Sequence, residues 1–214
     1  MRYEEQRRQV VAIVEELYKA GLITPTGGNV SLRLPGGEGY LITPSGMFKG
    51  GLRPEDIVFV DPRGNPDPQG GVPSIETSMH LEVYGVRPRV AAVLHAHSPM
   101  TTLAGVLRVR IPAVTVEAVA FGQLPVVPFV VPGSPELAQA VAQAFREAPV
   151  APAVLLQNHG VVTVGETLRQ AANAALALEE VCRLAIMCLL LDREPVEIPP
   201  EAQEMLRRLM FERP

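Results

Sequence analysis

Residues 90–98 read VAAVLHAHS, an apolar run that ends in two histidines one residue apart. A short continuous stretch of small and branched apolar residues is typical of a buried strand. Side chains two residues apart on a strand point to the same face, so His95 and His97 project together if the strand continues through them. Ser98 and Pro99 then fit the N-cap and first position of a helix. The pair therefore lies at the carboxyl end of a strand, where α/β sheets usually carry their sites.

A third histidine, His159, follows another apolar strand in the segment LLQNHGVV. Three neutral imidazoles with a water or a carboxylate would form an open zinc site. Spacing alone does not show that His159 meets the other two, because a histidine after a strand is more often a hydrogen-bonded polar residue than a ligand. The fourth histidine, His80, lies within the helical pattern ETSMHLEVY and is expected to be structural.

Glu76, in the segment VPSIETSMH, is the carboxylate that we attach to this site. The helix macrodipole alone is enough to favour an acidic residue in a first helical turn. Beside a metal, however, the same carboxylate could alternate between ligand and general acid/base.

Two turns rich in glycine and hydroxyl residues, TPTGGNVS at 24–31 and ITPSGM at 42–47, are candidate anion sites. Small residues let the backbone approach an anion, and hydroxyl and N–H groups donate hydrogen bonds to it, so phosphate is the natural ligand. Each pattern is weak by itself, and no nucleotide-binding fingerprint accompanies it.

Composition excludes several classes of function. The formal net charge is −4 without a clustered basic stretch, which predicts no nucleic-acid partner. No apolar run is long enough to cross a membrane and no secretory signal is visible, so we expect no membrane association and a cytoplasmic location. Cys182 and Cys188 lie six apart in a helical segment, on different faces, and are expected to be unpaired.

Hydrophobic periodicity and turn residues predict alternating helices and strands along the chain. We expect one mixed α/β domain over residues 1–214, with helices covering a sheet that is at least partly antiparallel. The predicted helices span 2–20, 76–84, 135–146, 168–191 and 201–211, with another beginning at Ser98. The predicted strands span 30–34, 40–42, 57–60, 90–94, 126–130, 153–156 and 161–164.

The motifs GGNVS, ITPSG, RPEDIV, PSIETSMH, AVLHAHSP, LPVVPF and NHG, in this order, resemble the class II aldolase/adducin family. The resemblance runs from the first helix to about Leu191. It implies a three-layer αβα domain around a mainly antiparallel sheet. It also implies a homotetramer whose active sites lie between neighbouring subunits.

Carried over residue by residue, the resemblance implies a metal site and a phosphate site. His95, His97 and His159 would bind one Zn²⁺ per subunit, with Mn²⁺ or Co²⁺ possible in its place. Glu76 would be the catalytic acid/base and a fourth ligand. The phosphate site would comprise Thr26, Gly28, Asn29, Thr43, Ser45, Gly46 and Ser74.

The reaction that the resemblance implies is the reversible cleavage of a ketose 1-phosphate into dihydroxyacetone phosphate and an aldehyde of the lactaldehyde type. Zinc would act as a Lewis acid that stabilises the enediolate, and Glu76 would exchange a proton with its carbon. Two positions depart from the family's aldolase pattern: Ile75 replaces a phosphate-binding serine, and Val116 replaces an interfacial tyrosine that donates a proton at the aldehyde end. Glu117 is our substitute candidate for that donor.

Other activities on the same scaffold compete with an aldolase. Pentulose-phosphate 4-epimerases carry Asp where this chain has Glu76, which favours an aldolase. The sequence argues less strongly against a methylthioribulose-1-phosphate dehydratase or a decarboxylating relative. A non-enzymatic, adducin-like interaction module would not need three histidines and a carboxylate around an open metal site.

Overall fold

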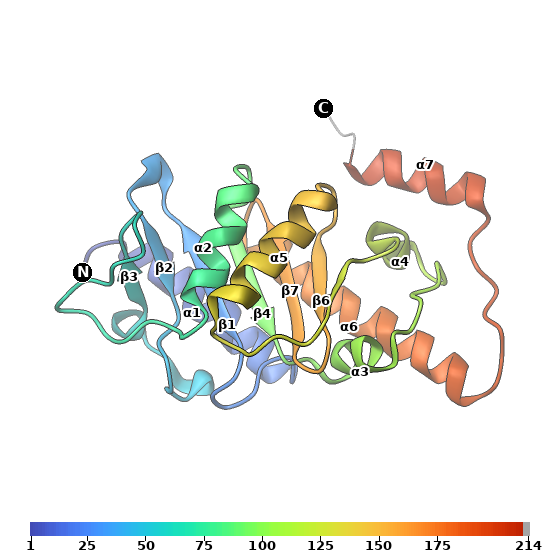
Figure 1. Ribbon diagram of the computed structural model, residues 1–214, viewed down its shortest axis with the longest axis horizontal. Helices are drawn as coiled ribbons and strands as arrows, with labels where there is room; N and C mark the ends of the chain where they lie inside the picture. The colour runs from blue at the N-terminus through green and yellow to red at the C-terminus, as the bar shows by residue number, and fades with distance from the viewer. Residues whose placement is uncertain (212–214) are drawn as a thin grey trace.

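Seven strands form one mixed sheet in the computed structural model, which describes residues 1–211 (Figure 1). Their order across the sheet is β3-β2-β1-β4-β7-β6-β5. Neighbouring strands are antiparallel except at one edge, where β5 and β6 run parallel, so the predicted mainly antiparallel sheet is confirmed. The strands are β1 (Asn29–Arg33), β2 (Tyr40–Ile42), β3 (Val58–Val60), β4 (Ala92–Ala96), β5 (Val126–Val127), β6 (Ala153–Leu156) and β7 (Gly160–Gly165).

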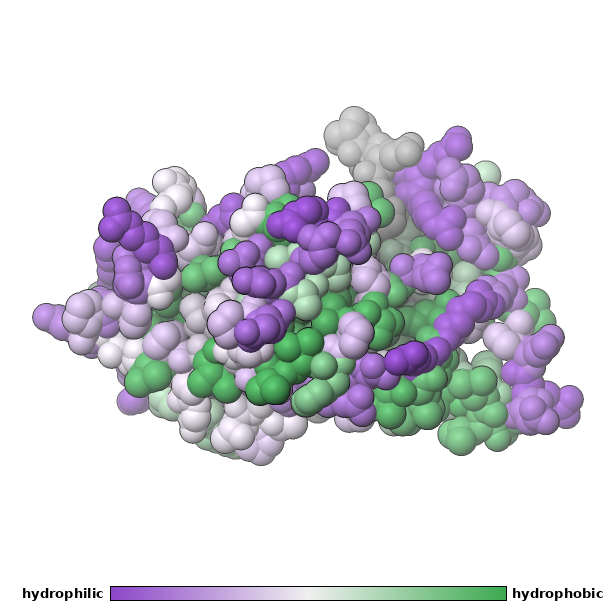
Figure 2. Space-filling model, viewed as in Figure 1, coloured by the Kyte–Doolittle hydropathy of each residue, from purple (hydrophilic) through white to green (hydrophobic). Residues whose placement is uncertain are grey.

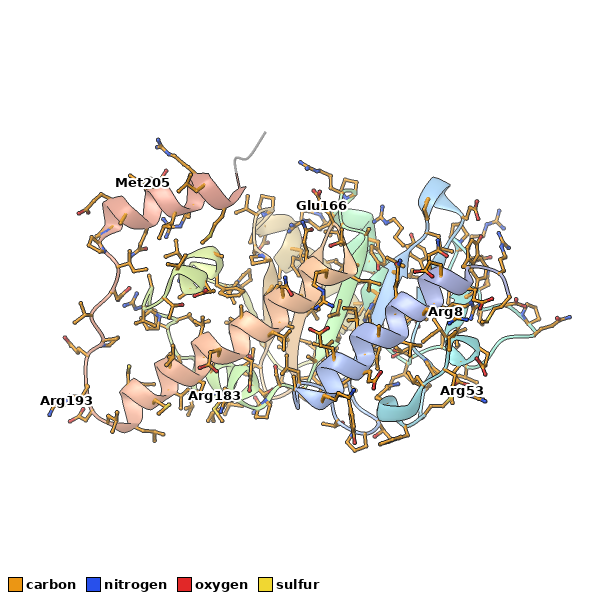
Figure 3. All side chains as sticks on the ribbon, turned by 180° about the vertical axis from the view of Figure 1, so that it is seen from behind. Arg8, Arg53, Glu166, Arg183, Arg193 and Met205 are labelled. Atoms are coloured by element: carbon orange, nitrogen blue, oxygen red, sulfur yellow. The ribbon has the colours of Figure 1, made fainter. Side chains whose placement is uncertain are left out.

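Helices cover both faces of the sheet, which confirms the predicted αβα layering. Helices α2 (Thr77–Val86) and α5 (Pro135–Glu147) lie on one face. Helices α1 (Glu4–Lys19) and α6 (Leu168–Leu190) lie side by side on the other, as the view from behind shows (Figure 3). The remaining helices are α3 (Pro99–Leu107), α4 (Val116–Phe121) and α7 (Pro200–Phe211), with 3₁₀ turns at Pro35–Gly37, Lys49–Gly51 and Pro54–Asp56.

The alternation of side chains along β4 decides which of its residues face each helical layer. Leu94 and Ala96 join the apolar cluster beneath α1 and α6, whereas Val93 joins the cluster beneath α2 and α5. His95 belongs to the same side as Val93. It is therefore directed toward the layer that contains α2, the helix that follows Glu76.

The structure differs from the predicted elements in several places. Strand β4 spans Ala92–Ala96 and not 90–94, so it contains His95 and ends before His97. Strand β5 ends at Val127 and not at Val130, because its partner β6 ends at Leu156, opposite Val127. The six-residue helix α4 was not predicted, although the Thr115 side chain caps it by accepting from the Ala118 N–H. Glu76 is the residue before α2 and not a member of its first turn.

Beyond α6 the chain forms an arm that brings α7 back against α4 (Figure 1). The arm is fixed to the segment before α4 by the Ile198 N–H, which donates to the Ala113 carbonyl at 2.9 Å, and by Glu197, which pairs with Arg110. Within residues 1–211, no helix is both long enough and apolar enough to span a membrane.

Candidate metal centre and catalytic carboxylate

Three histidines meet at the carboxyl end of β4. His95 lies in that strand, His97 follows it, and His159 lies in the turn between β6 and β7. Because β7 pairs with β4, this turn is adjacent to the end of β4. The Nε2 atom of His95 lies 2.9 Å from Nε2 of His97 and 3.2 Å from Nε2 of His159. The potential ligand atoms of these three histidines all lie within 4.8 Å of one another.

The turn that carries His159 has an unusual backbone. Asn158 adopts a left-handed conformation with φ of 60°, which asparagine tolerates better than most residues. Gly160 packs so closely on the Ala96 carbonyl that a Cβ atom would collide with it. The tight turn thereby brings the His159 ring next to the His95 ring, with 4.5 Å between their centroids.

Hydrogen bonding and burial leave the imidazoles neutral, with nitrogen lone pairs available. The Nδ1 atom of His95 is 3.0 Å from the Val161 carbonyl, which fixes the proton on Nδ1 and leaves Nε2 as an acceptor. Burial, followed by the neighbouring His97 and His159, holds the pKa of His95 well below its usual value. Burial also lowers the pKa of His97 to about 4, and it lowers the pKa of His159 against the opposing effect of Glu76.

Glu76 completes the cluster from the helical layer that His95 faces, where it directly precedes α2. Its Oε2 lies 3.4 Å from Nε2 of His95, and its Oε1 lies 3.5 Å from Nε2 of His159. The carboxylate is only 5% exposed, and Oε1 has no hydrogen-bond partner among the described residues. Converging imidazole nitrogens and an unpartnered buried carboxylate oxygen are the donor set that a divalent cation such as Zn²⁺ prefers, so the residues fit a metal.

The segments predicted to bind phosphate come together beside this cluster. The Thr43 N–H donates to the Val30 carbonyl, and the Ser74 N–H donates to the Thr43 carbonyl. The Lys49 N–H donates to the Pro25 carbonyl, which ties the second loop to the first. These backbone bonds join residues 24–30, 43–49 and 72–76 into one wall.

Within this wall, the predicted residues differ in whether they can reach a ligand. Thr26 and Gly46 are exposed, Ser45 is half-buried, and Gly28 is buried beneath its loop. Ser74 is 7% exposed, and its hydroxyl oxygen accepts from the Glu76 N–H at 3.3 Å. The φ of Gly46 is +67°, a conformation that a residue with a side chain rarely adopts.

Two predicted phosphate residues have side chains that are engaged elsewhere. The Thr43 hydroxyl is fully buried and accepts from the Val30 N–H at 3.2 Å. The Asn29 amide donates to Oε2 of Glu76 at 2.8 Å and accepts from the His80 ring. The structure therefore places the Asn29 side chain with the carboxylate and not at the surface of the phosphate loops.

Lys49 is a residue that sequence reasoning missed. Its side chain is 2% exposed, and its ammonium donates to the Pro44 carbonyl at 2.6 Å. Burial lowers the pKa of Lys49 to about 8. The available signal was its position two residues after ITPSGM in a chain with only two lysines, Lys19 and Lys49.

The candidates for the aldehyde end lie elsewhere on the chain. Val116 and Glu117 occupy the first turn of α4, and both are exposed. No hydrogen bond or ion pair within residues 1–211 links Glu117 to a histidine of the cluster.

A family model described as the class II aldolase and adducin N-terminal domain matches residues 8–186. The chain belongs to this family. The resemblance that the motifs indicate is thereby confirmed, including the likeness within the class II aldolase family to L-fuculose-1-phosphate aldolase.

Three relatives that are similar to this chain are named for different activities. An L-fuculose phosphate aldolase of Haemophilus influenzae is 36% identical, with 97% of this chain and 93% of that protein covered. A 5-methylthioribulose-1-phosphate/5-deoxyribulose-1-phosphate aldolase of Escherichia coli O45:K1 is also 36% identical, over 84% of this chain and 83% of that one. A 3-oxo-tetronate 4-phosphate decarboxylase of Escherichia coli K12 is 35% identical, over 83% and 84%.

A solved structure of an L-fuculose 1-phosphate aldolase superposes with a TM-score of 0.86 at 31% identity, covering 95% of each chain. These relatives are lyases, and the prediction of an enzyme of the class II aldolase type is confirmed.

Proposed function

We propose that this enzyme is a metal-dependent sugar-phosphate aldolase that reversibly cleaves a ketose 1-phosphate into dihydroxyacetone phosphate and an aldehyde. The observation that carries the proposal is the position of Glu76. Its unpartnered Oε1 lies 3.5 Å from Nε2 of His159, and its backbone belongs to the wall that the three loops form. A carboxylate in this position can exchange a proton with a carbon of a substrate whose phosphate is held nearby.

His95, His97 and His159 would hold one divalent cation per subunit, and zinc suits three imidazoles and a carboxylate best, with manganese or cobalt as alternatives. When bound, the cation supplies Lewis-acid stabilisation of the negative charge that is left when the carbon–carbon bond breaks. Glu76 delivers a proton to the carbon that loses its partner, or removes it in the synthetic direction. Asn29 holds the carboxylate in place while Ser45, Gly46 and Ser74 receive the phosphate.

The names of the relatives support a 1-phosphate substrate. The Escherichia coli O45:K1 relative is named as an aldolase of two ribulose 1-phosphates, and the superposed solved structure is named as an L-fuculose 1-phosphate aldolase. Each match covers more than four-fifths of this chain. A lactaldehyde-type or a simpler deoxy aldehyde would be the second product.

Val116 favours a second candidate activity, the decarboxylation of a 3-oxo acid phosphate, for which the Escherichia coli K12 relative is named. An aldol cleavage needs a group that removes the proton from the substrate hydroxyl, whereas loss of carbon dioxide does not. Val116, which is 47% exposed, offers no such group where the family's aldolases have tyrosine.

We propose that the enzyme is a homotetramer with sites between subunits, and that residues 1–214 form a single domain. Exposed apolar side chains support self-association: Figure 2 shows them gathered over α3 and the end of α6. They include Leu103, Val106, Leu107, Met187, Leu190 and Leu191. A surface patch of this kind commonly marks a protein interface.

The proposal is tested by incubating the metal-loaded enzyme with ketose 1-phosphates, ketose 5-phosphates and a 3-oxo acid phosphate, and identifying the products. We expect dihydroxyacetone phosphate and an aldehyde from a 1-phosphate. Release of carbon dioxide from the 3-oxo acid phosphate, without cleavage of any ketose phosphate, would establish the decarboxylase instead. An isomerised or dehydrated product would contradict both proposals.

The role of Glu76 has a separate test. Glu76→Gln is expected to lose proton exchange between solvent and dihydroxyacetone phosphate by about 100-fold or more, since general acid–base catalysis contributes that much or more. The measurement is deuterium incorporation followed by NMR. Exchange at the wild-type rate would show that another group moves the proton.

A further inference from the structure

A line of buried polar side chains runs from Glu76 into the core between α2 and β1. Glu76, His80 and Tyr84 are spaced four residues apart, which corresponds to about 6 Å along a helix. Asn29 and Ser31 are two residues apart on β1, which corresponds to about 6.8 Å along a strand. Because the two repeats nearly match, side chains from the helix and the strand alternate along one line.

Each neighbouring pair in this line is hydrogen-bonded. The Asn29 amide nitrogen is 2.8 Å from Oε2 of Glu76, and the Asn29 amide oxygen is 2.5 Å from Nε2 of His80. The other ring nitrogen of His80 is 2.7 Å from the Ser31 hydroxyl, which is 2.8 Å from the Tyr84 hydroxyl. All five side chains are buried, with exposures between 1% and 5%.

The carboxylate fixes the direction of these bonds. An ionised Glu76 can only accept, so Asn29 must present its NH₂ group to Glu76 and its carbonyl oxygen to His80. His80 must then donate from Nε2 and accept at Nδ1, which requires Ser31 to donate to His80. If the bonds ran in the reverse direction, the Asn29 carbonyl oxygen would face the Glu76 carboxylate. Two acceptors would then face each other without a proton between them.

The inner end of the line is held on three sides. Arg33 donates to the Tyr84 carbonyl at 2.6 Å, and its guanidinium lies 4.7 Å from the centre of the Tyr84 ring. The Tyr40 ring stacks on Tyr84 with 4.9 Å between centroids. The Tyr84 hydroxyl is also 3.3 Å from the Ala91 carbonyl. The far end of the line therefore has little freedom to move.

We propose that His80 is a positioning residue for Glu76, acting as the Nε2–H tautomer through Asn29 to hold the catalytic carboxylate in one rotamer. This inference rests on the catalytic role proposed for Glu76. It assigns a function to a histidine whose ring is hydrogen-bonded to Asn29 and Ser31 and to none of His95, His97 and His159. Buried hydrogen-bonded chains of this kind rigidify a site because every member is satisfied only in one arrangement.

The first test is kinetic. His80→Leu fills a similar volume without a donor, and kcat is expected to fall by about 10- to 100-fold, the usual cost of losing a group that orients a ligand or base. KM for the ketose phosphate and the metal content should change less than about threefold. His80→Gln, whose amide nitrogen can replace Nε2, should recover much of the lost kcat. Tyr40→Phe loses a hydroxyl in the same aromatic pair but outside the line, and serves as the matched control with unchanged kcat.

The second test does not depend on activity. Nitrogen-15 NMR of the histidine rings in the wild-type enzyme should show His80 protonated on Nε2 and unprotonated on Nδ1. The opposite tautomer would overturn the proposal, even if His80→Leu failed to fold. An unchanged kcat in folded His80→Leu would overturn it as well, while cleavage by the wild type still upheld the proposed function. Failure of the wild type to act on any sugar phosphate, with the expected tautomer present, would count against the proposed function alone.

Discussion

The proposed site has a metal end, formed by the three histidines and Glu76, and a phosphate end, formed by the wall of three loops. The two ends are built in different ways. Side chains make the metal end: two histidines at the end of β4, one from the turn before β7, and a carboxylate supported from α2 and β1. The phosphate wall consists of three loops whose polar groups largely bond to one another. The metal end therefore allows little change at any position, whereas single loop residues can vary and tune the substrate.

The largest effect is expected at the metal end. His159→Ala removes one of three imidazoles from a half-buried turn, and we expect metal affinity to fall by about 100-fold or more, with loss of activity. Metal content after dialysis is the measurement. Thermal unfolding provides a check, since a chelator should lower the Tm of the wild type but not that of the variant. Wild-type metal content in His159→Ala would refute the three-histidine site.

Intermediate effects are expected in the phosphate loops, where one hydroxyl can be removed and another added. Ser45→Ala should raise KM for a phosphorylated substrate by about 10-fold or more, because a hydrogen bond to a charged group such as phosphate contributes about 1.5 kcal/mol or more. Ile75→Ser should lower KM by a similar factor, and since Ile75 is 67% exposed the exchange disturbs no core packing. Both variants should keep the wild-type metal content. Equal KM values in all three proteins would place the phosphate elsewhere.

The smallest effect concerns Lys49 and the stability of the wall. Burial lowers the pKa of Lys49 in the folded protein to about 8, from the usual lysine value of 10.5. Between these two pH values the unfolded chain therefore binds the proton more tightly than the folded one. The wild type should therefore gain stability relative to Lys49→Met as pH rises from about 8 toward 10.5, by up to about 1.4 kcal/mol per pH unit. Urea unfolding at several pH values measures the difference. A difference that does not change with pH would show that the ammonium is not buried in solution.

The sequence predicted the metal end better than the phosphate end for a physical reason. The two-residue period of a strand paired His95 with His97, whereas the resemblance to the family, and not spacing, joined His159 to them. The hydrogen bond between Asn29 and His80 depends on the position of α2 along β1. The hydrophobic periodicity within either element does not predict that position. The same limit hid the bond from Lys49 to Pro44, because local patterns do not report which buried cation meets which carbonyl.

The success of the predicted bounds varied among the elements. The long helices α5 and α6 begin at the predicted residues and end one residue from the predicted ends, and strands β2 and β6 have the predicted bounds. Helix α4 has only six residues, too few for a period to emerge, and β5 was predicted too long because its length depends on where its partner β6 ends.

The pairing of β4 with β7 also sets an order of events during synthesis. His95 and His159 are separated by 64 positions. At roughly 5–20 residues per second, the ribosome adds the second about 3 to 13 s after the first. Throughout that interval the nascent chain has only the His95–His97 pair, without the third imidazole. If a metal needs all three histidines, as we propose, we expect it to be held only after the hairpin of β6 and β7 closes the centre of the sheet, late in the maturation of the enzyme.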